Sequence, residues 1–573
     1  MTNNWKIKNN LESADSQINT KYSRLILRLL AERGLAKETV IEEFFNPSYS
    51  SGVHDPFLFN AMDEAVSRIA TAKKNQEKIG IFGDYDADGV TATAIIFETL
   101  TQLGFSGMEV YIPDRQTEGY GMNIEAIKKL QESGVSLIIT VDCGITNVEE
   151  VAFAKLNKVD VIITDHHHVP KILPEAVALI NPHMENCGYP FADLAGVGVA
   201  FKLAEALYEK IDPKNKEQLK WLLDLVAIGT IADCVPLLGE NRILTKYGLV
   251  VLSKTRNVGL LEMFKVGKIV IDENNIPDTQ KVAFQIAPRI NASGRMNHAS
   301  ASYNLIVEES VASARNMALE VEASNQKRQK ITKEIVREVK AIAQNLFKDR
   351  KLIFAANEHW QVGILGLIAG RISSELNKPI AVFQKQEKEF VGSFRSIPAV
   401  NIIEILEKCS DLLIRFGGHS QAAGVRVLPE NMDKFYEKMA QIIETDLQGK
   451  DLAPEIEIDL EISPNQVSWE LLEEIRLMEP FGQGNKEPVF LMKNMLIDDL
   501  RVVGTGSKHL KLSLRAKNDS SKIFAGIGFS FGEKFPELQK GDVMDVVFNL
   551  QQDEWNGNKK MQLNLIDLKK TAE

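Results

Sequence analysis

Residues 78–90 read KIGIFGDYDADGV, a short apolar run followed at once by three alternating carboxylates. The run IGIF is typical of a buried strand. Asp84, Asp86 and Asp88 then stand so close together that their negative charges repel one another. Because a bound cation removes this repulsion, the stretch predicts a divalent-metal site at the end of a strand.

Two further apolar runs also end in metal-binding residue types. The run LIITV is followed by Asp142, and the run VIIT is followed by Asp165, His166 and His167. Short apolar runs alternate with helix-like segments over residues 79–180, which predicts a parallel sheet with helices on both faces. Ligands bind at the carboxyl ends of strands in such sheets, so we expect the three clusters to meet at one edge.

The composition limits the class of protein. The chain has 573 residues, too many for one core, of which 44% are hydrophobic and 25% charged. It starts without a signal-peptide core and has no apolar run of membrane-spanning length, so we expect no membrane association. The four cysteines form no CxxC pair, which argues against structural zinc and suits a reducing cytoplasm. The net charge of −11 gives no overall attraction to nucleic acid but is compatible with a local basic channel.

Changes of pattern along the chain divide it into five parts of an α/β protein. A segment of nearly forty residues without Pro or Gly predicts a long helix that links two domains. The C-terminal stretch HLKLSLR alternates apolar and polar residues, as expected for a half-buried strand of a small barrel. We predict an N-terminal helical extension (1–50), a parallel-sheet catalytic domain (51–305), a linking helix (306–348), a smaller α/β domain (349–450) and an OB-like β-barrel (451–573).

The first carboxylate cluster has two alternative interpretations. It resembles the start of an EF-hand loop, but the twelfth position counted from Asp84 is Ile95, where a calcium loop needs a bidentate Glu. The predicted flanks are also a strand and a helix rather than two helices. A solvated acidic turn is the second alternative, and the ligands at the other strand ends argue against it.

Other candidate ligands have structural alternatives too. Asp142 could equally cap the helix that follows it. Asp233, in the apolar segment GTIADCV, is either a metal ligand or a member of a buried salt bridge, because an unpaired buried charge is costly. Adjacent side chains of an extended segment point to opposite sides, so at most two of three consecutive histidines should face one site. We favour His166 and His167, since Asp165 can orient a ligating imidazole.

The residue types also indicate which metal binds. Carboxylates mixed with histidines suit Mn²⁺ or Mg²⁺, and a pair of ions about 3.5–4 Å apart suits displacement at phosphorus. Zinc is less favoured because oxygen ligands outnumber nitrogen ligands and no thiolate takes part.

Four ordered motifs, GDYDADG, VDCGI, TDHHH and GTIAD, resemble the metal-binding motifs of the DHH phosphoesterase superfamily. Downstream, RSIPAVNIIEIL and FGGHSQAAGV resemble its associated C-terminal substrate-binding domain. The segments IPDRQTEGYGM, LAGVGVAFKLA, PRINASGRM and EPFGQGN are similar to the RecJ branch, and the likeness runs from about residue 50 to the end. One departure is Phe82, which stands where many members of the superfamily carry a His.

The resemblance implies roles for particular residues. The implied metal ligands are Asp86, Asp88, Asp142, His166 and Asp233, and Asp84 either ligates the second metal in place of the missing His or supports the residues that do. Asp165, His166 and His167 are implied as catalytic, and Asp165 and His167 would be additional ligands, orient a ligand or donate a proton. The implied phosphate-binding residues are Arg115, Arg289, Arg295, Ser393, Arg395, Gly417, Gly418 and His419. The alternatives are surface ion pairs for the arginines and a tight turn for the glycine pair.

The resemblance further implies a 5′-to-3′ exonuclease that hydrolyses single-stranded DNA to 5′-mononucleotides in DNA repair and recombination. The cysteine content suits the cytoplasm, and nothing in the sequence demands more than a monomer. The resemblance implies Mn²⁺ or Mg²⁺ as cofactor, as two ions, and a single-strand-binding protein and a helicase as partners. His509, Lys511 and Arg515 of the OB-like segment, with Phe524, Phe529 and Phe531 nearby, suit single-strand binding, although core packing is the commoner use of Phe. Two alternatives are a phosphodiesterase of small nucleotides or oligoribonucleotides, and a non-catalytic DNA-binding scaffold.

Overall fold

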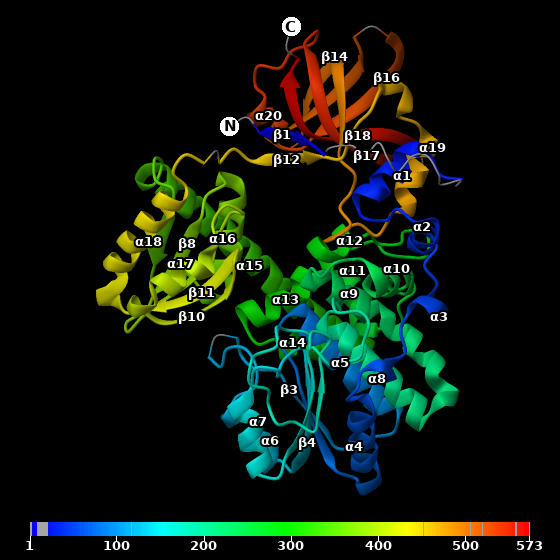
Figure 1. Ribbon diagram of the computed structural model, residues 1–573, viewed down its shortest axis with the longest axis vertical. Coiled ribbons are helices and arrows are strands. Elements are labelled where there is room, and N and C mark those ends of the chain that lie inside the picture. Colours follow the sequence, from blue (N-terminus) through cyan, green and yellow to red (C-terminus); the bar gives the residue numbers. More distant parts are fainter. Residues whose placement is uncertain are drawn as a thin grey trace. The chain divides into compact units, whose positions relative to one another are not determined.

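The structure, a computed structural model, describes residues 3–8, 21–115, 117–450, 452–504, 506–517, 519–555 and 558–571 (Figure 1). Two compact units form, one of residues 51–452 and one that joins residues 1–50 to residues 453–573. The five domain boundaries drawn from the sequence stay predictions. Most of the segment on which the signal-peptide expectation rests lies outside the described residues, and no helix within them is long and apolar enough to cross a membrane.

A five-stranded parallel sheet forms the first part of unit 51–452, as the sequence predicts. Its spatial order is β3-β2-β4-β5-β6, so β2, β4 and β5 are neighbours at its centre. Phe82 pairs with Thr140, and Val141 with Thr164, so these three strands end at the same edge. The strands are β2 (Lys78–Phe82), β3 (Met108–Tyr111), β4 (Val135–Val141), β5 (Asp160–Thr164) and β6 (Ala178–Ile180).

Helices cover this sheet on both faces (Figure 1). On one face α6 and α7 bury apolar residues against Phe82, Ile138 and Ile163. On the other face α5 and α8 pack against the strands and against each other. The helices of this layer are α4 (Met62–Asn75), α5 (Ala87–Gln102), α6 (Ile124–Glu132), α7 (Val148–Leu156) and α8 (Gly196–Ile211).

After the sheet, the chain forms a layer of helices. Helix α9 is buried along nearly its whole length and ends at Asp233, which lies beside His166. The layer consists of α9 (Leu223–Asp233), α10 (Gly239–Leu252), α11 (Val258–Gly267), a π-helix η4 (Val282–Ile286), α13 (Ala287–Met296) and α14 (Ser300–Val307).

The predicted long helix is present as α15 (Val311–Leu346), capped by the Ser310 side chain. It packs against α11, α13 and α14 on one side and against α16 and β7 of the next domain on the other. The helix therefore joins the two α/β parts of this unit (Figure 1).

The second α/β part has a mixed five-stranded sheet in the order β10-β11-β9-β8-β7. Only β7 and β8 are parallel, and the other neighbours are antiparallel. Helix α16 packs on one face of the sheet, and α17 and α18 pack on the other. The elements are β7 (Ile353–Asn357), α16 (Val362–Leu376), β8 (Ile380–Lys385), β9 (Phe390–Arg395), α17 (Ile402–Lys408), β10 (Leu413–His419), β11 (Ala422–Val427) and α18 (Met432–Asp446).

The second unit contains a closed barrel in the order β14-β15-β16-β18-β17, with β17 paired back to β14. Leu510, Leu512 and Leu514 of β15 all point into its core, as the alternation predicts. The strands are β14 (Phe490–Val503), β15 (His509–Ala516), β16 (Asp519–Gly528), β17 (Val543–Trp555) and β18 (Asn558–Lys570).

The N-terminal prediction is partly wrong. Residues 24–32 and 38–45 form helices α1 (Arg24–Glu32) and α2 (Glu38–Phe45), but β1 (Asn4–Ile7) is a strand. It pairs in parallel with β12 (Glu455–Ile458), so its conformation depends on a partner some 450 residues later in the chain. Local sequence pattern contains no information about such a partner. The prediction of a helical extension over residues 1–50 therefore did not include the strand β1.

Glu98 gives a test of packing around α5 that does not involve the metal site. It lies with Asp224 and Glu309 along a pocket of about 310 Å³, and burial, followed by these two charges, raises the pKa of Glu98 to about 7. Because the folded-state pKa exceeds the ordinary value, ionised Glu98 destabilises the fold above pH 7, and this penalty disappears below about pH 4.5.

We expect Glu98→Gln to raise the free energy of unfolding at pH 8 by about 1–3 kcal/mol, and to have little effect at pH 4.5. Thermal melts of the two proteins at both pH values measure this. Glu132→Gln, on the exposed side of α6, is the matched control and should change neither melt. An equal effect of Glu98→Gln at both pH values would contradict the argument.

Candidate metal centre

The turn that carries the first three carboxylates is shaped by a helix cap and a close backbone approach. Asp86 caps α5, since its Oδ1 accepts hydrogen bonds from the amides of Asp88 at 2.9 Å and Gly89 at 3.1 Å. A side chain at Gly89 would lie 2.8 Å from the backbone of Asp84, so only glycine fits. The positive end of the α5 dipole also favours negative charge at this point.

Asp88 is held by the N-terminus of another helix. Its carboxylate accepts hydrogen bonds from the amides of Gly196 at 2.8 Å and Val197 at 2.9 Å, in the first turn of α8. A Cβ at Gly196 would come within 2.4 Å of Asp142 Oδ1, and a Cβ at Gly229 within 2.7 Å of Asp88 Oδ1. The glycines of LAGVG and GTIAD therefore let α8 and α9 approach the carboxylates.

Asp142 has an unusual backbone conformation and is buried. Its φ of +59° lies in the left-handed region, which costs energy for a residue other than glycine and is common at functional sites. Its amide donates to Thr164 O at 3.0 Å, which ties the ends of β4 and β5 together. The alternative role as a helix cap is wrong, because the cap residue of α7 is Asn147.

His166 lies among three carboxylates. Its Nε2 is 3.2 Å from Asp142 Oδ1, 3.7 Å from Asp233 Oδ2 and 3.9 Å from Asp88 Oδ2. His168 is exposed, so two of the three histidines face the site, as the extended geometry predicts. Asp233 is half-buried at the end of α9, and among the described residues no Lys or Arg lies within ion-pair distance of its carboxylate.

Asp165 acts on the neighbouring backbone and on His167. Its Oδ1 accepts from the amides of His166 at 2.7 Å and His167 at 3.0 Å and lies 2.8 Å from His167 Nδ1, while its Oδ2 accepts from the Ile145 amide. Both oxygens are thereby occupied, which supports an orienting role rather than metal binding.

Among the described residues, three groups of three residues each bring their ligand atoms within 4.8 Å of one another, which is close enough to share a metal ion. Asp142 and His166 each belong to two of the groups, so the groups are adjacent. Asp84 Oδ1, Asp142 Oδ1 and His166 Nε2 are buried and have no hydrogen-bond partner in the part of the chain that the structure describes. The groups are Asp84, Asp86 and Asp142; Asp88, His166 and Asp233; and Asp142, His166 and His167.

The electrostatics also fit a cation. Burial, and after it the charge of neighbouring carboxylates, raises the pKa of Asp84, Asp88 and Asp142 well above the usual range. Burial, and after it His167, lowers the pKa of His166 to about 4, so its imidazole is neutral and able to bind metal. Buried carboxylates of this number need a compensating positive charge.

Phe82 is fully buried in the sheet core, and its position can supply no ligand. Asp84 instead shares a group with Asp86 and Asp142, which supports its predicted role as substitute ligand.

Three of the predicted phosphate-binding arginines form a positive cluster. The Arg115 guanidinium lies over the Tyr85 ring, 4.8 Å from its centroid. In the sequence, Tyr85 stands between Asp84 and Asp86. Burial, followed by the charges of Arg115 and Arg328, lowers the pKa of Arg295 to about 9. Burial and Arg115 likewise lower the pKa of Arg395. These residues come from the β3–α6 loop, α13 and β9, and a bound anion would relieve the repulsion among them.

Ser393 belongs to this cluster and Arg289 does not. Arg395 Nη1 donates to Ser393 Oγ at 3.3 Å. Arg289 Nε instead donates to Glu322 of α15 at 2.7 Å, and its other nitrogens donate to the carbonyls of Gln285 and Gly267. The ion-pair alternative thus describes Arg289, although its ion pair is largely buried.

Gly417, Gly418 and His419 lie in the exposed edge strand β10. Gly418 has a φ of +147°, and a Cβ there would meet Ala422 O at 2.2 Å, so the hairpin to β11 explains this glycine. A Cβ at Gly417 would meet nothing within 4 Å, so the strand is open to a ligand here. Their role in substrate binding stays a prediction.

Comparison with known proteins agrees with this arrangement. Residues 78–230 match the DHH family N-terminal domain, residues 349–445 the DHHA1 domain and residues 458–567 the RecJ OB domain. The chain is 38% identical over 545 residues to the single-stranded-DNA-specific exonuclease RecJ of Bacillus subtilis (95% of this chain, 67% of that one). It is 34% identical over 530 residues to the RecJ of Haemophilus influenzae (90% of this chain, 91% of that one).

The chain belongs to the RecJ family of single-stranded-DNA-specific exonucleases.

Solved structures of the RecJ family agree with the fold and the metal. RecJ of Thermus thermophilus in complex with Mn²⁺ superposes with a TM-score of 0.83 at 26% identity, over 100% of this chain and 80% of that one. Its complex with Mg²⁺ has a TM-score of 0.76 at 25% identity, over 100% of this chain and 79% of that one. The predicted family and the fold class with its DHH domain, DHHA1 domain and OB barrel are confirmed, and these two RecJ structures contain the ions, Mn²⁺ and Mg²⁺, that the residue types here favour.

Several residues that build this RecJ-family site were missed in the sequence. Asn291 Oδ1 accepts from the Ala87 amide at 2.9 Å, Gly196 and Val197 hold Asp88, and Tyr120 contacts His167. All lie within the segments that resemble the RecJ branch, but none is a usual metal ligand or phosphate binder. The family-like segments were the only signal that could have found them.

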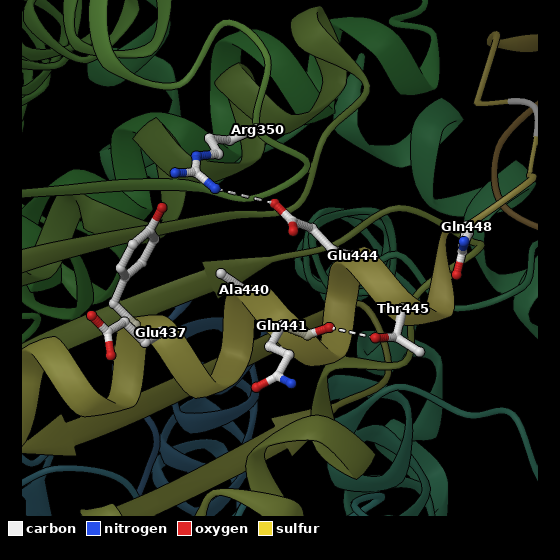
Figure 2. Close-up of a pocket in the computed structure, with 8 residues that line it drawn as sticks. Arg350, Glu437, Ala440, Gln441, Glu444, Thr445 and Gln448 are labelled. Carbon is white, nitrogen blue, oxygen red and sulfur yellow. Dashed lines mark hydrogen bonds and ion pairs between the residues drawn. The ribbon is translucent and has the colours of Figure 1, made fainter.

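One hollow of this unit lies away from the metal centre (Figure 2). It has a volume of about 560 Å³ and lies along α18, where Arg350 forms an ion pair with Glu444 at 3.6 Å. Its lining contains none of the candidate site residues. The lining residues are Arg350, Tyr436, Glu437, Ala440, Gln441, Glu444, Thr445 and Gln448.

Gly196 tests whether the packing of α8 forms the metal centre. We expect Gly196→Ala to weaken Mn²⁺ binding by about 10-fold or more, because its Cβ would displace Asp142. Titration of the metal-free protein with Mn²⁺ measures the affinity. In Gly198→Ala, on the same helix, the nearest contact of the added Cβ is the Leu194 side chain at 3.2 Å, and this variant should have the smaller effect. Equal effects of the two substitutions would show that Gly196 has no special role.

Proposed function

We propose that this chain is a metal-dependent exonuclease that removes 5′-mononucleotides from the 5′ end of single-stranded DNA. The observation that carries the proposal is the adjacency of the carboxylate–histidine centre and the arginine cluster. Asp86 belongs to a metal-binding group, and its charge also acts on Arg295 of the cluster. A terminal phosphate bound by the arginines would therefore place the first phosphodiester near the metal ligands.

The residues divide the work of hydrolysis. Asp84, Asp86, Asp88, Asp142, His166 and Asp233 would hold the ions. Bound Mn²⁺ or Mg²⁺ supplies an activated water and neutralises charge that develops on the phosphoryl oxygens. Asp165 fixes Nδ1 of His167, which orients the imidazole toward the group that Asp142 and His166 form. Arg115, Arg295 and Arg395 would grip the 5′ phosphate through two-point guanidinium contacts and so set the polarity.

The barrel is proposed to bind single-stranded DNA. The RecJ OB domain match covers it, and His509, Lys511 and Arg515 are at least partly accessible on β15. Phe524 and Phe531 are buried in the core, while Phe529 is 59% exposed and its ring centroid lies 5.4 Å from that of His509. Of the three phenylalanines, Phe529 is thus the one available to stack on a base.

This proposal is favoured over the two alternatives. A phosphodiesterase of small nucleotides needs no OB barrel, and a scaffold needs no complete set of metal ligands. We further propose a monomeric protein of the cytoplasm that works in DNA repair and recombination with a single-strand-binding protein and a helicase. The family resemblance supports these last points.

A substitution of Asp142 tests whether hydrolysis takes place at the metal centre. We expect Asp142→Asn to lower the release of mononucleotides more than about 100-fold, because the residue belongs to two ligand groups. The assay is a time course on long single-stranded DNA labelled at either end, with and without Mn²⁺. Circular dichroism should show an unchanged fold.

Near-normal release by this variant would refute the assignment. Faster hydrolysis of a dinucleotide than of the long strand would favour the small-nucleotide alternative. Binding of DNA without any release by the wild-type protein would favour the scaffold.

The arginines give a separate prediction about the 5′ phosphate. We expect Arg115→Lys to lower kcat/KM on 5′-phosphorylated single strands by about 10-fold or more, because a lysine makes no two-point contact. On 5′-hydroxyl strands the same change should have little effect. Arg289→Lys is the matched control, since Arg289 is paired with Glu322, and it should leave the ratio of the two rates unchanged. If Arg289→Lys changed the ratio of the rates on 5′-phosphorylated and 5′-hydroxyl strands, Arg289 would be a phosphate-binding residue after all.

A further inference from the structure

Tyr120 contacts both the second and the third metal-binding motif through one hydroxyl. The hydroxyl lies 2.8 Å from His167 Nδ1 and donates to Asp142 O at 3.1 Å. The Tyr120 ring also stands edge-on to the His167 ring, with centroids 5.2 Å apart and planes at 62°. No metal or substrate role has been assigned above to this residue.

The hydrogen bonds around Tyr120 have a defined direction. Asp165 Oδ1 also lies 2.8 Å from His167 Nδ1, and a carboxylate accepts, so Nδ1 carries the proton. The Tyr120 oxygen then accepts a share of this N–H, and its own proton goes to the Asp142 carbonyl. One side chain thereby restrains the imidazole and the peptide of the strained Asp142 together.

Contacts of the described residues on both sides of Tyr120 fix its place. Glu118 accepts hydrogen bonds from the Tyr111 hydroxyl at 2.7 Å, the Asp114 amide at 2.9 Å and the Asn123 side chain at 2.9 Å. Gly121, with a φ of +83°, lies so close to the Asn147 side chain that a Cβ would come within 2.7 Å of it. These contacts direct the Tyr120 hydroxyl toward His167.

Burial alone does not fix the position of Tyr120, since the residue stays 43% exposed. The hydroxyl, in contrast, makes both of the contacts described. Arg115 of the arginine cluster lies on the same loop as Tyr120, so this loop contributes residues to the arginine cluster and to the surroundings of the metal centre.

We propose that Tyr120 is a positioning residue that holds His167 and the Asp142 peptide in the geometry needed for hydrolysis. The proposal rests on the exonuclease function and names a further residue of the same site. Groups that orient ligands in this way typically change affinity or activity 10–100-fold when removed.

The test is Tyr120→Phe, which keeps the ring and removes the hydroxyl. At saturating Mn²⁺ we expect kcat on single-stranded DNA to fall about 10–100-fold while KM changes less than about 2-fold. The Mn²⁺ affinity, from titration of the metal-free protein, should fall by up to about 10-fold, and the melting temperature of the metal-free protein should stay the same. Tyr436→Phe, on α18 in the pocket of Figure 2, is the control and should change none of these values.

Three results would overturn the proposal. One is a kcat within about 2-fold of the wild-type value. Another is a rise in KM with unchanged kcat, which would make Tyr120 a substrate-binding residue. The third is a lower melting temperature of the metal-free variant together with the loss of kcat, which would indicate a structural role. Failure of the exonuclease proposal is distinguishable, because the wild-type protein itself would then release no nucleotides.

Discussion

Repulsion among buried carboxylates is the constraint on which the rest of this structure depends. Asp84, Asp88 and Asp142 are almost completely buried within one small volume, and their pKa values are raised because burial and mutual repulsion oppose ionisation. Backbone amides at the start of α8 donate hydrogen bonds to Asp88 and so offset part of its charge. A cation held by the ligand groups would offset the rest of the negative charge. Glycines at the closest helix contacts make this approach sterically feasible.

A second cluster of like charges lies beside the first. Burial and the charge of Arg115 lower the pKa of Arg295 and of Arg395, and the three arginines come from a loop, a helix and a strand. The carboxylate cluster and the arginine cluster together favour a ligand with two different ends. One end would be negatively charged and contact the arginines, and the other would hold an electrophilic centre next to the metal. A phosphorylated end of a nucleic acid strand has both properties, and α15 fixes the two α/β parts of the unit that supply the arginines.

Much of this site could be predicted because it depends on strand ends. Parallel strands that are neighbours bring their carboxyl ends to one edge, so Asp84, Asp142 and His166 were expected to meet and they do. Asp165 was expected to orient a histidine, and its hydrogen bond to His167 has this geometry. Arg289 shows the limit of such reasoning. Its partner Glu322 is 33 residues away on another helix, and sequence pattern does not reveal that pairing.

The sequence by itself determined the family, the parallel sheet, the metal-binding residue types and the long helix. These depend on local periodicity and on ordered motifs, which are readable along the chain. Only the tertiary structure decided that Gly196 and Val197 hold Asp88, that β1 pairs with β12, and that Tyr120 contacts His167. Such contacts join segments that are distant along the chain, and their energies depend on distances and angles that no single segment specifies.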